Sequence, residues 1–391
     1  MTTADEILFE VRKENLETGL RGYPVGYCTT STVDPMKGLF YAGHPVSAID
    51  HWEPEQVIYL LYHGREGSEE EVGKFAEGLR KRAKCSSELI QHIQKLPRKG
   101  HPMKLFSAAI LLAGIFEGKN DYQEDCLNII AKIPEIAATV INYHAGWGAS
   151  KPSQPNLGYM ENFTQMLNVP NGDQKKLLQA FKLFNILHYD HGGGNLSAFV
   201  GKAVASGLED LYGAISAAMC ALAGPKHGKA NQDCLTFVQN LLKEAGENAT
   251  EAQLETTLVD KLAKNELIFG FGHAVLRVED PRATLLYKVT KENYPGHPLV
   301  KLAHLLRKTG SKVLKGNPKI SDPHPNVDAI SGIMLMAAGF PNPEYYTLLF
   351  GLARVVGISL QILYERLKAR GGKGTPIVRP KYFYKSAEDK L

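Results

Sequence analysis

The 391-residue sequence has few cysteines, two tryptophans and no long apolar run without a charge. Its five cysteines (Cys28, Cys85, Cys126, Cys220 and Cys234) are odd in number and widely spaced, and none belongs to a CxxC pair. A disulfide framework and a zinc knuckle both need closely patterned cysteines, so the spacing disfavours both. The cysteine usage indicates a reducing compartment.

A large charge of either sign is also missing. The formal net charge is +4, which is small for this length and gives no reason to expect a nucleic-acid partner. The most apolar stretch, residues 346–364, carries Arg354 in its middle, so we expect no membrane span. Acidic side chains at Asp5, Glu6 and Glu10 disfavour a signal or transit peptide. Together these absences predict a cytoplasmic protein.

Helical periodicity dominates what is present. Apolar residues recur at spacings of three and four in the stretches 69–84, 104–118, 125–146, 174–190, 211–224, 251–267, 298–310 and 346–370. Strand patterns are confined to residues 22–33 and 38–46. Because strands and helices do not alternate, a doubly wound nucleotide-binding sheet is not expected. The predicted fold class is mainly α, in a chain long enough for roughly two domains.

One glycine-lined corner carries a histidine. The stretch "GPKHGKANQD" places His227 between Gly-Pro and Gly, directly after the apolar run 211–223. A lone histidine in such a position is usually a packing or capping residue. Glycine-rich turns on a helical frame are nevertheless frequent positions for binding and catalytic groups. The assignment of His227 therefore depends on whether similar turns occur elsewhere.

A second turn, "HYDHGGGNLS", carries His188, Asp190 and His191. A metal site would need a third and fourth ligand that this spacing does not supply, so we predict no metal here. Three successive glycines let backbone N–H groups approach a ligand closely, and His191 can donate to a carboxylate. Asn195 and Ser197 are expected to cap the next helix.

Two further turns carry ionisable groups. "GFGHAVLRVEDPR" contains His273, Arg277 and Arg282 but lacks the strand and third glycine of a dinucleotide fingerprint. Guanidinium groups near a glycine turn suit a phosphate or a carboxylate, which they bind bidentately. "HPNVDAISG" places Asp328 at a helix start, where it is either a cap or a general base in an apolar pocket.

The order and flanks of these turns resemble the citrate synthase family. The resembling stretches are "HYDHGGGNLSA", "LAGPKHGKANQ", "GFGHAVLRVEDPR", "HPNVDAISG", "YYTLLFGLARVVGI" and "VRPKY", with "GLRGYPVGYCTTSTVDPMKGLFYAGHPV" near the start. The glycine-arginine-glycine opening is closer to the eukaryotic-type branch. The resemblance implies a homodimer whose subunits have a large helical domain (1–228 and 340–391) and a smaller mobile one (229–339).

The resemblance also implies a reaction and its residues. Acetyl-CoA and oxaloacetate condense, and citryl-CoA is hydrolysed to citrate and CoA without a metal or redox cofactor. The implied catalytic residues are Asp328 as base, His227 as enol stabiliser and His273 as acid. Those implied for oxaloacetate are His191, Arg282, Arg354 and Arg379, with Arg379 reaching the neighbouring subunit's site. Those implied for CoA are Arg277 and Arg21.

Two alternatives stay open from the sequence. A 2-methylcitrate synthase, which uses propionyl-CoA, needs the same residues and differs by space for one methylene, worth only ~1–3 kcal/mol. A catalytically silent helical binding protein is the alternative from another class. Two positions depart from the family pattern: Gly192 stands where an acidic residue is common, and His324 where an aromatic ring usually precedes Pro-Asn.

Overall fold

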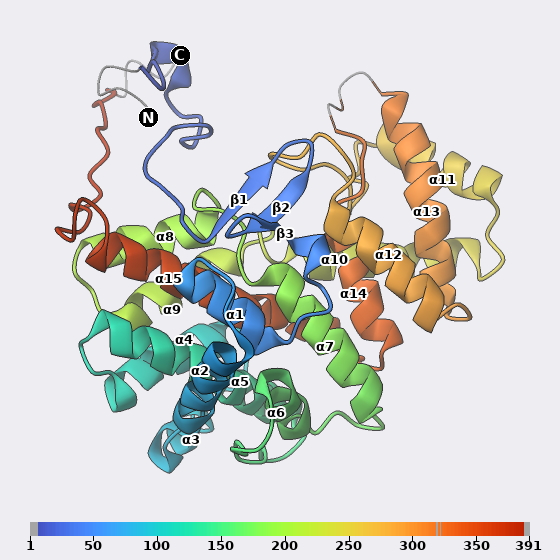
Figure 1. Ribbon diagram of the computed structural model, residues 1–391. Coiled ribbons are helices and arrows are strands. Elements are labelled where there is room, and N and C mark those ends of the chain that lie inside the picture. Colours follow the sequence, from blue (N-terminus) through green and yellow to red (C-terminus); the bar gives the residue numbers. More distant parts are fainter. Residues whose placement is uncertain (1–6, 318–319, 321, 387–391) are drawn as a thin grey trace.

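The computed structural model describes residues 7–317, 320 and 322–386 (Figure 1). Helices make up 58% of it and strands 3%, so the mainly α prediction is confirmed. The first nine α-helices are α1 (Pro54–His63), α2 (Glu69–Arg82), α3 (Ser87–Ile93), α4 (Pro102–Glu117), α5 (Tyr122–Ala145), α6 (Tyr159–Met166), α7 (Gln174–His188), α8 (Leu196–Ser206) and α9 (Leu211–Leu222). The others are α10 (Ala230–Ala245), α11 (Glu251–Ala263), α12 (Pro281–Asn293), α13 (Pro298–Lys315), α14 (Asp328–Ala337) and α15 (Tyr346–Leu367).

The helix ends follow local chemistry. At the start of α2, the Ser68 hydroxyl accepts from the backbone N–H of Glu71, whose carboxylate accepts from the N–H of Ser68. Helix α5 continues through Pro134, which cannot donate to the carbonyl of Ile130. The hydroxyl of Tyr159 donates to that carbonyl at 2.9 Å, so the missing backbone bond is replaced.

Every stretch with helical periodicity forms a helix, and the largest difference lies at the end of α13. The periodicity predicts an end at Gly310, whereas the helix continues to Lys315. A Cβ on Gly310 would lie 2.4 Å from the ring of Phe271. This glycine is therefore a point of close packing inside the helix and not a stop signal.

The strands form one small antiparallel sheet, in the order β1 (Ser31–Asp34), β2 (Gly38–Tyr41) and β3 (His44–Pro45). Ser31 pairs with Tyr41, and Asp34 pairs with Gly38. The prediction of strands near the N-terminus is confirmed for residues 31–33, 38–41 and 44–45, whereas residues 22–30 and 42–43 form no strand. Tyr41 is buried and anchors the sheet to the helical body.

The helices fall into two groups in space (Figure 1). Helices α10 to α14 pack mainly on one another at one side of the molecule, and the other helices surround α15. This arrangement is compatible with a small domain at 229–339, and its mobility stays a prediction. Helix α15 is, among the described residues, the one segment with the length and apolar composition of a membrane span. Since 94% of that window is buried, α15 is the central core helix.

Candidate active site

Four turns and one helix converge at the junction of the two groups. The ring centroids of His191, after α7, and His273, before α12, lie 5.3 Å apart. The ring of His227, between α9 and α10, lies 6.4 Å from the ring of Phe350 on α15. The Arg354 guanidinium stacks over that same Phe350 ring at 4.7 Å. Residues separated by more than 160 positions therefore share one site.

The His227 ring is held by the first turn of α8. Its Nε2 accepts from the backbone N–H of Ser197 at 3.2 Å, with the Ser197 hydroxyl at 2.9 Å. Burial, reinforced by the charge of Arg354, lowers the pKa of His227 to about 4. The ring is therefore neutral near pH 7, and its proton is on Nδ1 because Nε2 is an acceptor. No hydrogen bond within the described part of the chain uses Nδ1, which leaves a donor available.

His273 has the opposite tautomer. Its Nδ1 accepts from the backbone N–H groups of Val275 and Leu276, at 3.0 and 2.9 Å. Burial and the nearby charge of Arg282 lower the pKa of His273. The neutral ring consequently carries its proton on Nε2. Two neutral imidazoles with different tautomers thus line the site, each fixed by backbone amides.

Asp328 is the first residue of α14, and its side chain does not cap the helix. The cap interaction comes instead from Asn326, whose side-chain oxygen accepts from the backbone N–H of Asp328 at 3.0 Å. Burial raises the pKa of Asp328 to about 6, opposed by Arg282 and by a side-chain hydrogen bond from Asn231. The carboxyl is therefore not a helix cap. It is half-buried and its pKa is raised, which increases its basicity, and its role as a general base stays a prediction.

The two buried arginines have different partners. Arg282 forms a bidentate pair with Asp280, at 3.1 and 2.7 Å, and also donates to the carbonyl of Leu187 at 3.3 Å. Burial opposes the charge of Arg282, but Asp280 outweighs this effect and raises its pKa. Arg354 donates through Nε to the carbonyl of His188 at 3.0 Å.

No carboxylate of the described residues forms a salt bridge with Arg354, which is 1% exposed. Burial lowers its pKa to about 10, so it remains a cation near pH 7. A buried, unpaired guanidinium is unfavourable unless an anion binds it. Arg354 is therefore the strongest indication of an anionic ligand in the site.

The side chains of the turn after α7 make contacts within the fold. His188 is buried, and its Nδ1 lies 2.7 Å from the carbonyl of Phe184. The Asp190 carboxylate accepts from Thr30 at 2.5 Å, Ser31 at 2.7 Å and Gln361 at 2.7 Å. In the ranges that the structure describes, no group of three or more His, Cys, Asp or Glu could hold a metal ion.

Three predicted residues lie outside this cluster. Arg277 is exposed at its edge and donates to the carbonyls of Leu276 and His273. Arg21 is exposed in the N-terminal segment. Arg379 lies in the extended C-terminal tail, where the N–H of Val378 donates to Ser206 at the far end of α8.

The position of the tail separates Arg379 from the site of its own subunit. Ser206 is nine residues along α8 from Ser197, which holds His227. At 1.5 Å per residue this corresponds to about 14 Å. The structure therefore does not bring Arg379 into the cluster within one chain.

Several residues of the site were not singled out from the sequence. Asn231, the second residue of α10, contacts both Asp328 and Ser331, and its position only four residues after His227 could have drawn attention to it. Nothing comparable in the sequence indicated a role for Thr30, Ser31 or Asp280.

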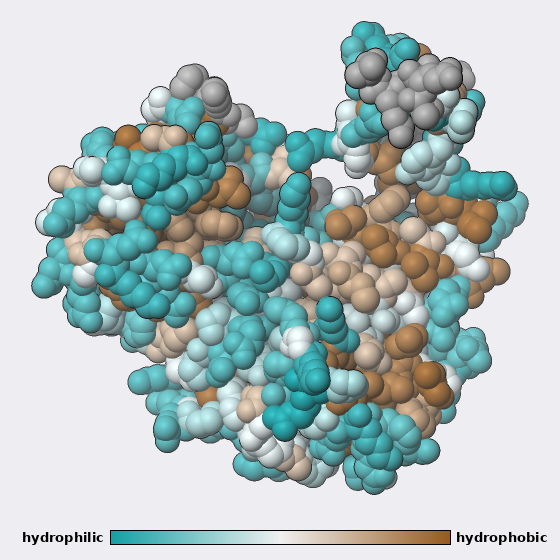
Figure 2. Space-filling model, turned by 180° about the vertical axis from the view of Figure 1, so that it is seen from behind, coloured by the Kyte–Doolittle hydropathy of each residue, from teal (hydrophilic) through white to brown (hydrophobic). Residues whose placement is uncertain are grey.

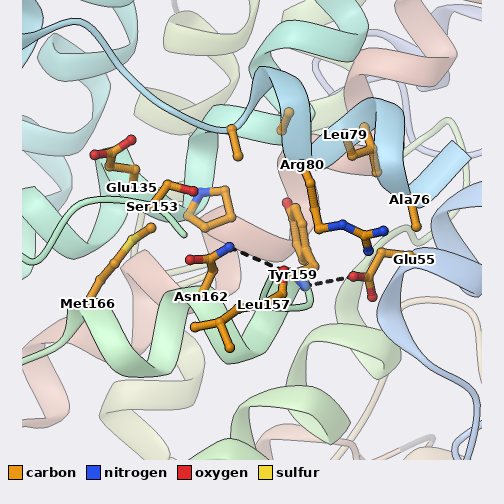
Figure 3. A pocket seen from close by; sticks show the side chains of 13 residues that line it. Glu55, Ala76, Leu79, Arg80, Glu135, Ser153, Leu157, Tyr159, Asn162 and Met166 are labelled. Atoms are coloured by element: carbon orange, nitrogen blue, oxygen red, sulfur yellow. Dashed lines mark hydrogen bonds between the residues drawn. The ribbon is translucent and has the colours of Figure 1, made fainter. Parts of the chain in front are cut away.

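A separate small cavity lies away from the histidines, between α2, α5 and α6 (Figure 3). The two carboxylates in its lining accept hydrogen bonds from backbone N–H groups. Glu55 points at the N-terminus of α6 and accepts from the N–H of Tyr159 at 2.7 Å, and Glu135 accepts from the N–H of Cys85 at 2.6 Å. The cavity contains none of the predicted site residues.

Comparisons with known proteins identify one family. A family model described as "Citrate synthase, C-terminal domain" matches residues 19–381. The mitochondrial citrate synthase of Citrus maxima is 35% identical over 387 residues, covering 93% of this chain and 80% of the relative. Mitochondrial citrate synthase 4 of Arabidopsis thaliana is 34% identical with the same coverages.

Two solved structures share the fold. Citrate synthase from Thermotoga maritima MSB8 has a TM-score of 0.80 and 26% identity, over 96% of this chain and 97% of that chain. Citrate synthase from Thermoplasma acidophilum, solved in a ternary complex with carboxymethyl coenzyme A and oxaloacetate, has a TM-score of 0.81 and 26% identity, over 94% of this chain and 95% of that chain.

Proposed function

This chain belongs to the citrate synthase family, and from that premise we propose that it condenses acetyl-CoA with oxaloacetate and hydrolyses citryl-CoA to citrate and CoA. The observation that carries the proposal is the buried Arg354, which lacks a carboxylate partner among the described residues and lies beside two neutral histidines and a carboxyl of raised pKa. A dicarboxylate substrate supplies the anion that this arrangement needs.

The first chemical step is removal of a methyl proton from acetyl-CoA by Asp328. A thioester methyl group is only weakly acidic, so the negative charge that develops on the thioester oxygen must be stabilised at the same time. The Nδ1–H of His227 is the donor for that oxygen. Positioned acid and base groups of this kind each contribute typically ~10²–10⁴-fold in rate.

The second step forms the carbon–carbon bond. The enol carbon attacks the carbonyl carbon of oxaloacetate, and the Nε2–H of His273 donates to the carbonyl oxygen, which becomes the hydroxyl of citryl-CoA. Arg354, Arg282 and His191 hold the substrate carboxylates. Water then cleaves the thioester, which gives the third carboxylate of citrate and the free thiol of CoA.

The remaining residues bind CoA and assemble the site. Arg277, at the exposed edge, and Arg21 are assigned to CoA phosphates, whose charge suits guanidinium groups. Closure of the 229–339 domain over oxaloacetate excludes water and completes the acetyl-CoA site. The reaction requires no metal or redox cofactor.

The functional unit is a homodimer in this proposal. Exposed apolar side chains lie on one face of α4, at Leu111 and Ile115, and along the C-terminal tail, at Ile377 and Val378. Figure 2 shows hydrophobic patches gathered on one half of the molecular surface, beneath the projecting terminal segments. Exposed apolar area of this kind favours burial against a second subunit. The tail then carries Arg379 to the neighbouring site.

The proposal also covers the acyl-CoA substrate that the enzyme prefers and its location in the cell. Acetyl-CoA is proposed over propionyl-CoA, the substrate of the 2-methylcitrate alternative. A cytoplasmic location is proposed from the cysteine usage, although the two plant relatives are mitochondrial.

Release of the CoA thiol, followed with a chromogenic disulfide, tests the proposal. Acetyl-CoA and propionyl-CoA are compared, each with and without oxaloacetate. Oxaloacetate-dependent release that favours acetyl-CoA is the expected result, and it should persist in excess EDTA. A preference for propionyl-CoA indicates 2-methylcitrate synthesis. No release from a folded sample with either thioester contradicts the enzymatic proposal and supports the silent binding protein.

A further inference from the structure

The hairpin formed by β1 and β2 contacts both walls of the site. Its base touches the turn that carries His191, and its tip touches the segment that carries His273 and Arg282. Figure 1 shows the hairpin between the two groups of helices. Because no residue of the hairpin belongs to the proposed catalytic set, these contacts call for a separate explanation.

The base of the hairpin holds the backbone on both sides of His191. The Ser31 hydroxyl donates to the Asp190 carboxylate at 2.7 Å and accepts from the N–H of Gly192 at 2.7 Å. From the other side, Gln361 on α15 donates to the Asp190 carboxylate at 2.7 Å and to the carbonyl of Gly192 at 3.2 Å. Asp190 and Gly192 are the immediate neighbours of His191, so these bonds determine where the imidazole lies.

The tip of the hairpin is preformed and meets the opposite wall. The Asp34 carboxylate accepts from the N–H groups of Met36 and Lys37, at 2.8 and 2.9 Å, which fixes the turn. The carbonyl of Pro35 then accepts from the backbone N–H of Arg277 at 2.8 Å. A peptide carbonyl in this turn thus binds the segment between His273 and Arg282 directly.

Gly38 makes the second contact at the tip. Its φ is +97°, and a Cβ at this position would lie 2.7 Å from Cγ of Pro281, the residue before Arg282. The hairpin backbone therefore packs directly against the start of α12. A side chain here would push the two walls apart.

We propose that the β1–β2 hairpin is a clasp that sets His191 and His273 against each other, with Ser31 as a positioning residue for His191 and the Pro35–Gly38 tip as the positioning element for the His273–Arg282 segment. The kinetic part of this proposal depends on the proposed function, because both histidines are assigned to oxaloacetate. Misplacing a substrate-positioning group by about 1 Å reduces rates by up to ~10²-fold, so loss of either end of the clasp should be measurable.

A matched pair of glycine variants tests the tip. Gly38→Ala and Gly43→Ala place a Cβ at similar positive φ angles, +97° and +92°, but nothing lies within 4 Å of the Cβ at Gly43. The backbone strain is therefore alike, and only Gly38→Ala displaces the opposite wall. We expect Gly38→Ala to lower kcat/KM for oxaloacetate by roughly tenfold or more relative to Gly43→Ala. Equal kinetics in the two variants, with equal unfolding midpoints, would overturn the clasp.

A second pair tests the base. Ser31→Ala removes the hydroxyl between Asp190 and Gly192, whereas Thr32→Ala alters the exposed neighbour on the same strand. Ser31→Ala should raise the KM for oxaloacetate severalfold, and Thr32→Ala should not. In the double variant Ser31→Ala/Gly38→Ala the two effects should be less than additive, because both substitutions disrupt the same connection between the His191 turn and the His273–Arg282 segment. Additive effects would contradict coupling through the hairpin.

Hydrogen exchange separates failure of the clasp from failure of the proposed function. The amide of Arg277 donates to Pro35, so its exchange should be faster in Gly38→Ala than in Gly43→Ala or the parent protein, with no substrate present. This result would support the clasp even if no thiol release occurred. Unchanged protection of the 273–282 segment in Gly38→Ala would overturn it even in a fully active enzyme.

Discussion

Two buried polar clusters in this protein contain carboxyl groups, and in both clusters burial raises the pKa of these groups. The clusters differ in whether their polar atoms have hydrogen-bond partners within the fold. In the cavity of Figure 3, Glu55 and Glu135 each accept from a backbone N–H at the start of another segment. In the proposed active site, backbone N–H groups bind one nitrogen of each imidazole, and the other nitrogen has no hydrogen bond among the described residues. The nitrogen without a bond is Nδ1 in His227 and Nε2 in His273.

This difference distinguishes buried polar groups that stabilise the fold from those that are kept available for a ligand. A buried polar atom that has a partner inside the fold contributes to stability, because leaving it unpaired is unfavourable. The site instead keeps a guanidinium that has no carboxylate partner among the described residues. A buried group of this kind reduces the stability of the empty protein and is retained where a ligand satisfies it. Substitutions of Asp328, Arg354 and Glu135 distinguish the two kinds of burial.

Removing the proposed base should have the largest effect. Asp328→Asn should lower kcat by ~10²–10⁴-fold, because the amide cannot accept the methyl proton. At pH 8 the same change should raise the free energy of unfolding by up to ~3 kcal/mol, because burial disfavours the ionised carboxylate. Steady-state thiol release and urea unfolding measure the two quantities. A fall in both activity and stability would contradict the functional assignment and place Asp328 with the structural acids.

Removing the unpaired cation should weaken oxaloacetate binding. Arg354→Met should raise the KM for oxaloacetate by about 30-fold or more, since loss of a buried charged partner weakens binding by ~2–5 kcal/mol. The matched control is Arg80→Met, which removes an arginine from the wall of the Figure 3 cavity. Similar kinetic effects of the two changes would abolish the distinction between the clusters.

The pH dependence should have opposite signs for activity and stability. Asp328 has a native pKa of about 6, against about 4 in an unfolded chain. Between these values the unfolded chain releases the proton and the native protein keeps it, so the contribution of Asp328 to stability falls as pH rises from about 4 to about 6. Over the same range kcat/KM should rise about tenfold per pH unit as the base ionises, and level off above pH 6.

The measurement is a pH profile of kcat/KM beside urea unfolding at the same pH values. Asp328→Asn should flatten the corresponding part of the stability profile. An activity profile without an acidic limb near pH 6 would argue against a single base of raised pKa.

Substitution of Glu55 or Glu135, the carboxylates of the Figure 3 cavity, should have the smallest kinetic effect. Glu135→Ala leaves the buried N–H of Cys85 without its acceptor, which should lower the free energy of unfolding by ~1–3 kcal/mol. Both KM values and kcat should stay unchanged. The control Glu88→Ala alters an exposed acid on nearby α3 and should change stability by less than ~0.5 kcal/mol.

Much of the fold could be predicted from local patterns. Helical periodicity located the long helices, because one apolar face at a spacing of 3.6 is a property of a short window. The end of α13 could not be predicted, because Gly310 is retained to admit the ring of Phe271 from another segment. Likewise, nothing in the sequence around residue 30 indicated that Thr30 and Ser31 would hold Asp190.

Local sequence patterns predict the fold class and the turns that carry His227, His273 and Asp328, because glycine spacing and amphipathic pattern act over a few residues. The hydrogen-bond partners of the site needed the tertiary structure. Nε2 of His227 accepts from Ser197, 30 residues away, and Arg354 donates to His188, 166 residues away, with no carboxylate partner among the described residues. The amide partners of His273 and the carboxylate partner of Arg282 lie within three residues of them in the chain, but the folded backbone is what brings them into hydrogen-bonding geometry. Hydrogen bonding and burial at a site are properties of what surrounds a residue in space, which local sequence does not contain.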